Sequence, residues 1–408
     1  MLQWLSIMGE YMAFFDDKLL LHGPTAERIY QSIKDLPIID YHCHLNEIEI
    51  ASDKRFASLG ELWLAGDHYK WRAMRLCGVP ERLITGDASF HDKYLEYAAI
   101  MPKLVGNPLY YWTHMELSQI FGIHRPLNAD TAEGIWDEAN RKLKDLSVRS
   151  LLAQFRVQYI ATTDDPFSPL THHGEIGGIE VRPTFRPDAC FARGVDFGTL
   201  EERLDYFVSK GCRIADHGFD DFADTTCLEW LMEACFRRGI LLQLHFGTFR
   251  NVNSLAFESI GRDSGFDVFR DHISVDKLAA LLDKMNVKLG GLPKMVVYPL
   301  NDAYLRPLAA LSGAFPNVLV GAAWWFNDTV EGIRRQLETV SEYAVLGTNL
   351  GMLTDSRSFS SYVRFDFYRR ILSSFLADKV DRGEYDLDAA LSLAQDLAYR
   401  NVKGVLGL

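Results

Sequence analysis

Short apolar runs of strand length alternate with longer amphipathic runs of helical spacing along most of the chain. This alternation is typical of strands and helices that follow one another in sequence. The predicted strands are 38–44, 157–163, 180–185, 212–215, 240–244, 294–298, 318–323 and 345–353. The predicted helices are 24–35, 200–210, 226–238, 275–285, 305–314, 330–342, 360–380 and 387–402. Eight strands with helices between most of them predict an α/β protein with a (β/α)8 TIM-like barrel.

Residues 52–150 interrupt this alternation directly after the first predicted strand. Residues 59–77 and 90–121 are rich in aromatic side chains at helical spacing, and no strand pattern is found nearby. We therefore predict a helical insertion that forms a cap on the barrel. The domain limits that follow are 24–51 and 151–408 for the barrel, 52–150 for the cap and 1–15 for an N-terminal extension.

The composition is that of a globular protein with a substantial core. Of 408 residues, 48% are hydrophobic, and the net charge is −12. This charge disfavours nucleic acid and anionic membranes as partners, although clustered arginines can still bind an anionic small molecule. Neither a signal peptide nor an apolar run of membrane length is recognised. Six scattered cysteines without a Cys-x-x-Cys pair indicate reduced thiols and a cytoplasmic location.

Two histidines, His42 and His44, lie at the end of the first predicted strand. Side chains two residues apart share one face of a strand, so both imidazoles can bind one metal ion. Taken alone, such a pair is more often two ordinary solvated or core histidines. Asp355 follows the last predicted strand, which lies beside the first in a closed barrel, and it would complete a mononuclear site. These ligands fit Zn, Mn, Fe or Ni, and we expect one divalent ion, with zinc as the leading candidate.

Other chemically active side chains also follow predicted strands. His245 is expected to be a metal ligand, a substrate contact or a hydrogen-bonded structural histidine, and the sequence leaves all three open. Arg186 and Arg357 both follow strands, and two guanidinium groups at one barrel mouth favour an anionic substrate. A surface salt bridge is the alternative for either arginine alone. His68 and Tyr69 lie in the predicted cap, where both could reach a ligand only from a helix start or a loop.

The chain resembles the uronate isomerase (glucuronate isomerase) family of the amidohydrolase superfamily. The resemblance runs from about Phe14 to Leu408. It rests on DYHCH at 40–44, DHYKWRAMR at 67–75, FRPD at 185–188, DHG at 216–218, LQLHFG at 242–247, AWWFND at 323–328 and LTDSRSF at 353–359. The AWWFND, LTDSRSF and His-Tyr segments are the most specific.

The resemblance implies an aldose–ketose isomerisation through ring opening and an enediol. D-glucuronate would become D-fructuronate, and D-galacturonate would become D-tagaturonate. The family's motifs imply metal binding by His42, His44 and Asp355, substrate binding by Arg186, Arg357, His245 and Trp325, and catalysis by His68, Tyr69, Asp355 and Arg357. In this scheme Asp355 and His68 open the sugar ring, and Tyr69 carries a proton between C2 and C1. The family also suggests a homo-oligomer.

Two alternatives remain open from the sequence. A mononuclear metal-dependent hydrolase of the same superfamily would use a similar ligand set. Residues 212–217 lack the bridging lysine of binuclear members, and 296–300 lack their histidine, which argues only against a binuclear hydrolase. The second alternative is a sugar-acid binding protein without activity. The preferred uronate is also open, because residues 364–366 read Arg-Phe-Asp where the family often has Arg-His-Glu.

Overall fold

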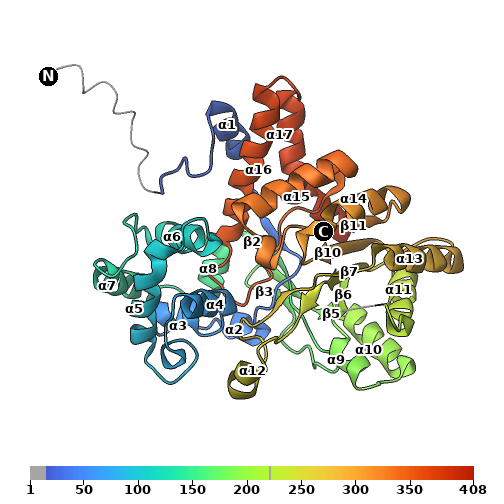
Figure 1. Ribbon diagram of the computed structural model, residues 1–408, viewed down its shortest axis with the longest axis horizontal. Coiled ribbons are helices and arrows are strands. Elements are labelled where there is room, and N and C mark those ends of the chain that lie inside the picture. Colours follow the sequence, from blue (N-terminus) through green and yellow to red (C-terminus); the bar gives the residue numbers. More distant parts are fainter. Residues whose placement is uncertain (1–14, 220–221) are drawn as a thin grey trace.

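The computed structural model describes residues 15–219 and 222–408, with parallel strands at the centre and helices around them (Figure 1). The parallel strands are β1 (Ile38–Asp40), β2 (Val157–Ala161), β4 (Ile179–Arg182), β5 (Thr184–Phe185), β6 (Ile214–Phe219), β7 (Leu241–Phe246), β10 (Met295–Pro299) and β11 (Val318–Val320). All residues of β7 and β10 are buried, as expected where helices cover both faces of a parallel sheet. The predicted α/β class with parallel strands is confirmed.

The strands form two parallel sheets, with the orders β1-β2-β4-β3 and β11-β10-β7-β6-β5. The predicted strand 180–185 is divided between them at Pro183, which cannot donate a backbone hydrogen bond. An isolated bridge between Asp164 and Phe185 links the two sheets. The remaining pairings are antiparallel and short, between β3 (Gly174–Ile176) and β4, and between β8 (Thr248–Phe249) and β9 (Val268–Phe269).

The predicted eighth strand, 345–353, is wrong. Leu346–Thr348 form a 3-10 turn, and Gly351 has φ +71°, which breaks any extended run. A Cβ on Gly351 would also lie 2.0 Å from the Leu397 carbonyl oxygen, so only glycine fits. Here side chains form hydrogen bonds with backbone groups that would otherwise bond to a neighbouring strand. For example, Asn349 Nδ2 donates to the Val320 carbonyl at 2.8 Å. These bonds come from residues distant in sequence, and the apolar pattern does not reveal them.

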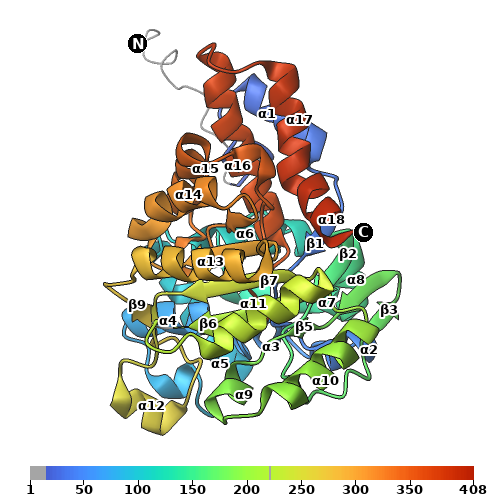
Figure 2. The same cartoon turned by 90° about the vertical axis from the view of Figure 1, so that its right-hand side faces the viewer.

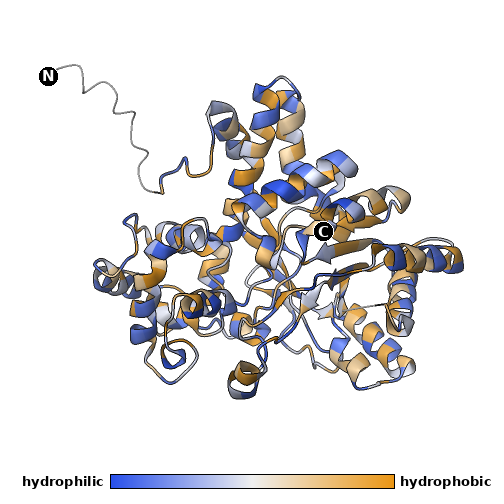
Figure 3. Ribbon diagram, viewed as in Figure 1, coloured by the Kyte–Doolittle hydropathy of each residue, from blue (hydrophilic) through white to orange (hydrophobic). Residues whose placement is uncertain are grey.

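Helices lie around the central parallel strands in the two orthogonal views (Figures 1 and 2). They are α1 (Pro24–Ile33), α10 (Phe197–Ser209), α11 (Thr226–Arg238), α13 (Val275–Leu289), α14 (Leu305–Ala314), α15 (Val330–Tyr343), α16 (Val363–Asp381), α17 (Leu387–Gln395) and α18 (Asn401–Leu406). Three further short helices are α2 (Glu47–Ala51), α9 (Asp188–Ala192) and α12 (Ser254–Ile260). Hydrophobic and hydrophilic residues fall on different sides of many of these helices (Figure 3), which explains why their periodicity was readable in the sequence.

Capping side chains decide where several of these helices begin. Asp196, Ser274 and Thr329 each accept a hydrogen bond from the backbone N–H three residues later. Each cap satisfies one of the N–H groups that a helix start leaves without a partner. The helix limits therefore agree with the sequence pattern to within a few residues.

Between β1 and β2, the described residues 52–150 contain helices and turns and no strand, as predicted. The helices are α3 (Leu59–Leu64), α4 (His68–Leu76), α5 (Phe90–Ile100), α6 (Pro108–Phe121), α7 (Ala132–Leu143) and α8 (Val148–Gln154). Most of them gather on one side of the strands in Figure 1. Their limits as a separate cap domain stay a prediction.

The longest described helix, α16, is buried over most of its length against α1, α6, α15 and α17. Even so, it carries Arg364, Arg369 and Arg370 among its buried residues. None of the helices in the described part of the chain is long and apolar enough to cross a membrane. The predicted N-terminal extension, residues 1–15, falls outside the described residues except for Phe15.

Candidate active site

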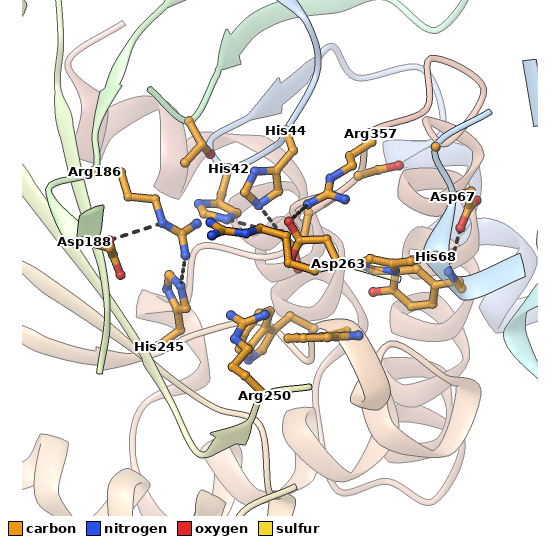
Figure 4. A pocket seen from close by; sticks show the side chains of 18 of the residues that line it. His42, His44, Asp67, His68, Arg186, Asp188, His245, Arg250, Asp263 and Arg357 are labelled. Carbon is orange, nitrogen blue, oxygen red and sulfur yellow. Dashed lines mark hydrogen bonds and ion pairs between the residues drawn. The ribbon is translucent and has the colours of Figure 1, made fainter. Parts of the chain in front are cut away.

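A cavity of about 490 Å³ opens at the carboxyl ends of β1, β2, β5 and β7. Figure 4 shows the side chains that project into it from the strand ends and from α4. Every candidate site residue named from the sequence lines this cavity, namely His42, His44, His68, Tyr69, Arg186, His245, Trp325, Asp355 and Arg357. The predicted gathering of distant residues at one end of the strands is therefore observed, although the roles of the individual residues are not tested by it.

His42, His44 and Asp355 form a compact group of potential metal ligands. One ligand atom from each lies within 4.8 Å of the others. The Nε2 atoms of His42 and His44 lie 3.3 Å and 3.2 Å from the same Asp355 oxygen, Oδ1. Burial alone would raise the pKa of Asp355, but hydrogen bonds from both histidines hold that pKa well below its usual range. Two imidazoles and an ionised carboxylate are a donor set that suits a divalent metal ion.

Backbone contacts between two distant segments hold these three side chains together. The Asp355 N–H donates to the His42 carbonyl at 3.0 Å, and the His44 N–H donates to the Ser356 carbonyl at 2.9 Å. Beside them the buried Asp40 carboxylate accepts from the Thr354 N–H at 3.0 Å and its hydroxyl at 2.6 Å. Strand β1 ends at Asp40, yet His42 and His44 still share one side, as the strand pattern predicted.

Asp216, in the middle of β6, lies behind the histidines and is fully buried. Its carboxylate oxygens lie 2.9 Å from His245 Nδ1, 3.2 Å from Arg186 Nη1 and 4.0 Å from His42 Nδ1. Burial would raise the pKa of Asp216, but its contacts with His245 and with the Arg186 guanidinium keep that pKa far below its usual range. Asp216 is therefore an anion that orients both a potential metal ligand and an arginine.

His245 does not belong to the metal-ligand group. Its Nε2 lies 3.0 Å from Arg186 Nη2, as Figure 4 shows, and its Nδ1 faces Asp216. A guanidinium nitrogen can only donate, so Nε2 accepts and the ring proton sits on Nδ1. With both nitrogens engaged, His245 orients Arg186 in this structure, and of the three possibilities left open by the sequence the metal-ligand one is not favoured.

The start of α4 delivers His68 and Tyr69 to the cavity. The Asp67 carboxylate accepts from the backbone N–H of Tyr69 at 3.0 Å and of Lys70 at 3.3 Å, and it pairs with the buried Lys70 ammonium at 3.1 Å. This N-cap fixes the first residues of the helix. The sequence-based condition that both side chains act from a helix start is met, because His68 is the first residue of α4.

Trp325 lies between His68 and Arg250. Its ring stacks on His68 with centroids 5.8 Å apart and planes inclined by 22°, and the Arg250 guanidinium lies 5.1 Å from the Trp325 ring centre. The backbone of Trp325 has φ +52°, a conformation that is uncommon for a bulky residue and recurs at functional sites. Trp325 thus forms an aromatic wall that holds the His68 imidazole in place.

The two predicted arginines differ in how firmly they are held. The three guanidinium nitrogens of Arg186 face Asp188, Asp216 and His245 at 3.0–3.3 Å. Arg357 pairs with Asp263 at 3.2 Å, and 36% of its side chain is exposed. Because an exposed ion pair is worth little, Arg357 can exchange Asp263 for another carboxylate at small cost.

Reasoning from sequence missed several residues of the cavity and its surroundings. These are Asp188, Asp216, Asp263, Asp328 and Arg364. Asp188, Asp216 and Asp328 do follow predicted strands, so their position was a usable signal. Asp263 comes from the excursion between β7 and α13, and Arg364 comes from the first turn of α16, where no local pattern marks either residue.

The His68 imidazole is expected to titrate below pH 6.5. Burial, followed by the Arg357 guanidinium, lowers the pKa of His68 from that ordinary value. His68 is then neutral at pH 7 and becomes protonated only as the pH falls through this lowered pKa. NMR of the imidazole Cε1–H signal, assigned by its loss in His68→Asn, measures the midpoint. In Arg357→Met the midpoint should rise by up to about one pH unit. A midpoint that does not move would exclude Arg357 as a cause.

A model of the glucuronate isomerase family matches residues 12–197 and 221–405 of the chain. The chain belongs to the glucuronate isomerase family. Among curated relatives of this family member, the uronate isomerase of Geobacillus thermodenitrificans is 39% identical over 459 aligned residues, which cover 96% of the chain and 98% of the relative. The uronate isomerase of Salmonella arizonae is also 39% identical, with the same coverage of both chains. The family predicted from the sequence is confirmed.

Solved structures support the same assignment for this glucuronate isomerase family member. The uronate isomerase of Thermotoga maritima superimposes with a TM-score of 0.91 at 29% identity, over 96% of this chain and 99% of that one. The glucuronate isomerase of Caulobacter crescentus gives a TM-score of 0.88 at 27% identity, over 96% and 97% of the two chains. These findings favour an isomerase over the hydrolase that the sequence left as the alternative.

Proposed function

We propose that this protein isomerises uronates, converting D-glucuronate to D-fructuronate and D-galacturonate to D-tagaturonate. Family membership over nearly the full chain supports the reaction. The observation that carries the proposal at the site is one cavity that combines a His-His-Asp group with arginines and with a His-Tyr pair. An anionic sugar needs the arginines, and an isomerisation needs acid and base groups beside them.

We assign His42, His44 and Asp355 as the ligands of one divalent metal ion, for which zinc is our leading candidate. The cluster geometry and the low pKa of Asp355 support this assignment. When bound, such an ion polarises a sugar oxygen and favours loss of its proton. His42 Nδ1 faces Asp216 at 4.0 Å, which is the kind of outer contact that orients a ligating imidazole.

We assign ring opening to Asp355 and His68. The cyclic uronate opens when the proton of the anomeric hydroxyl leaves and a proton reaches the ring oxygen. Asp355 is ionised and can accept the first proton, while His68, held against Trp325, can supply the second after protonation. Asp355 therefore removes one proton from the sugar and His68 adds one, so the number of protons on the sugar does not change.

We assign the proton transfer between C2 and C1 to Tyr69. Its phenolate would take the C2 proton as the C1 oxygen regains the proton that Asp355 had accepted, forming the enediol. The phenol would then return its proton to C1 as the C2 hydroxyl gives its proton to Asp355, so the aldehyde is reduced and the alcohol oxidised within one molecule. Burial, and next the Asp328 carboxylate, raise the pKa of Tyr69, whereas the Arg364 guanidinium lowers it. The phenolate thus depends on a cation nearby.

We assign the substrate carboxylate to Arg357 and carbonyl polarisation to Arg186, with His245 and Trp325 as further substrate contacts. The partial exposure of Arg357 and its single exposed ion pair with Asp263 support the first assignment. Arg186 is held rigidly by three neighbours, as suits a group that stabilises charge that develops during the reaction.

The function is tested with the purified protein on both uronates. We expect each to yield a ketose without consumption of water, and neutral glucose to react at least about tenfold more slowly because no carboxylate reaches Arg357. NMR of the products and metal analysis of the same sample are the measurements. Release of a hydrolysis product, or binding of glucuronate without turnover in metal-loaded protein, would contradict the proposal and favour the respective alternative.

We also propose that the two parallel sheets belong to one (β/α)8 barrel with residues 52–150 as its cap. The bridge at Asp164 and the backbone bonds from residues 355 and 356 to the segment after β1 support closure. A cytoplasmic location is supported by buried free thiols at Cys43, Cys190, Cys212 and Cys235. Assembly into a homo-oligomer remains a prediction from the family.

A further inference from the structure

We propose that Arg364, aligned by Asp328, is the positioning residue for Tyr69, holding the phenol in place and stabilising it when it has lost its proton. This inference rests on the proposed isomerisation and deepens it, because it names the group that makes a tyrosine usable as a base. Neither Arg364 nor Asp328 was among the candidate residues found from the sequence pattern. Arg364 lies in the first turn of α16 and lines the cavity together with Tyr69.

Arg364 contacts four segments of the chain, namely those that carry Tyr69, Trp112, Thr354 and Asp328. Its guanidinium carbon lies 5.0 Å from the Tyr69 ring centre and 4.0 Å from that of Trp112 on α6. Nη1 donates to the Thr354 carbonyl at 3.0 Å, next to the candidate ligand Asp355. Nη1 also lies 3.5 Å from Asp328 Oδ2, just after the turn that carries Trp325. Cations placed over aromatic rings at these distances attract the ring electrons, and most strongly when desolvated.

Burial makes this arrangement unusual. Both Arg364 and Asp328 have side chains that are 2% exposed, so the pair is desolvated. The Tyr69 hydroxyl, Asp328 Oδ1 and Arg364 Nε are all buried without a hydrogen-bond partner. A folded protein rarely leaves three polar atoms of one cluster unsatisfied, and such groups call for an explanation beyond packing. A site that must bind a hydroxylated sugar and form a phenolate supplies that explanation.

The four charged groups that act most strongly on Tyr69 come from four segments, and one of these four, Arg364, is positive. Asp67 at the start of α4, Asp328 after Trp325, and Asp355 beside the histidines all disfavour a phenolate, whereas Arg364 favours it. Loss of the arginine would leave three carboxylates against the phenol. A shift of this kind is large where water is excluded, because the local dielectric constant is low.

The competing explanation is that Arg364 only stabilises the packing of α16 and has no effect on Tyr69. Arg369 provides the matched control. Arg369 is a buried arginine on the same helix, and its Nη atoms donate to the carbonyls of Lys34, Leu36 and Pro37 at 2.8–3.1 Å. It pins α16 without lining the cavity. Arg369→Met should therefore reproduce the stability loss of Arg364→Met without its effect on Tyr69.

The test places 3,5-difluorotyrosine at position 69, whose phenol is more acidic than that of tyrosine and whose fluorine NMR signal reports ionisation. We expect Arg364→Met to raise the titration midpoint by about one to two pH units, and Asp328→Asn to lower it. Arg364→Lys, which keeps the charge, should lie between wild type and Arg364→Met and serves if the methionine variant does not fold. These readings do not require turnover, so they hold even if the wild-type protein makes no ketose and the proposed function fails.

The kinetic part of the test uses natural tyrosine and both uronates. Arg364→Met should lower kcat roughly 10- to 100-fold with KM changed less than about threefold, and fluorinated Tyr69 should recover part of that loss. A structural pin predicts no such recovery. Unchanged titration midpoints in Arg364→Met, Arg364→Lys and Asp328→Asn, or equal shifts in Arg369→Met, would overturn the inference.

Discussion

Replacing Asp355 with alanine is expected to remove the bound metal and to lower kcat/KM by at least about a thousandfold. The physical reason is that one oxygen of this carboxylate lies within 3.3 Å of both His42 and His44, so loss of the carboxylate removes one of the three proposed metal ligands. The same residue is also the proposed acceptor of the hydroxyl proton, so both functions vanish together. Metal content by plasma mass spectrometry and steady-state rates on glucuronate are the measurements.

Asp302→Ala is the control for this experiment. Asp302 is an aspartate that pairs with Arg335 near the surface and does not line the cavity. Its replacement should leave both metal content and rate unchanged. If Asp355→Ala retained stoichiometric metal and more than about a tenth of the activity, the assignment of Asp355 would be wrong. If Asp355→Ala kept the metal but lost activity, Asp355 would act in proton transfer and would not be needed as a metal ligand.

Replacing Tyr69 with phenylalanine is expected to stop exchange of the substrate C2 proton with solvent and to lower kcat by about 100- to 10,000-fold. The hydroxyl is the only atom removed. In the described structure it has no hydrogen-bond partner, so no polar atom loses a bond and folding stability should hardly change. Exchange is measured by NMR in heavy water, and stability by thermal unfolding of both proteins.

Tyr94→Phe is a suitable comparison, because Tyr94 is a buried tyrosine on α5 whose hydroxyl donates to the Ala132 carbonyl at 2.9 Å. Its loss should reduce stability slightly and leave C2 exchange intact. The two variants thus separate a chemical hydroxyl from a structural one. Unchanged exchange in Tyr69→Phe would take Tyr69 out of the proton-transfer step.

Much of the fold could be predicted because its signals are local. The periodicity of helices α10, α11, α13, α14 and α15 was readable residue by residue, since each buries one face. The strand runs at β7 and β10 were readable because buried parallel strands are almost continuously apolar. The segment after Val345 was misread for the opposite reason. There, side chains such as Asn349 and Asp40 replace a strand ladder, and their partners are far away in sequence.

The features of the site can also be divided into those that local sequence patterns predict and those that depend on tertiary packing. The sequence by itself determined that His42 and His44 share one side, that Arg186, His245 and Asp355 follow strand-like segments, and that the family motifs are present. Only the tertiary structure decided that His245 turns both nitrogens to Asp216 and Arg186, and that Arg364 and Asp328 lie against Tyr69. The physical reason is that the interactions concerned act over different distances along the chain. Backbone propensity and side-chain alternation act between neighbours, whereas buried charges find their partners only when packing brings distant segments together.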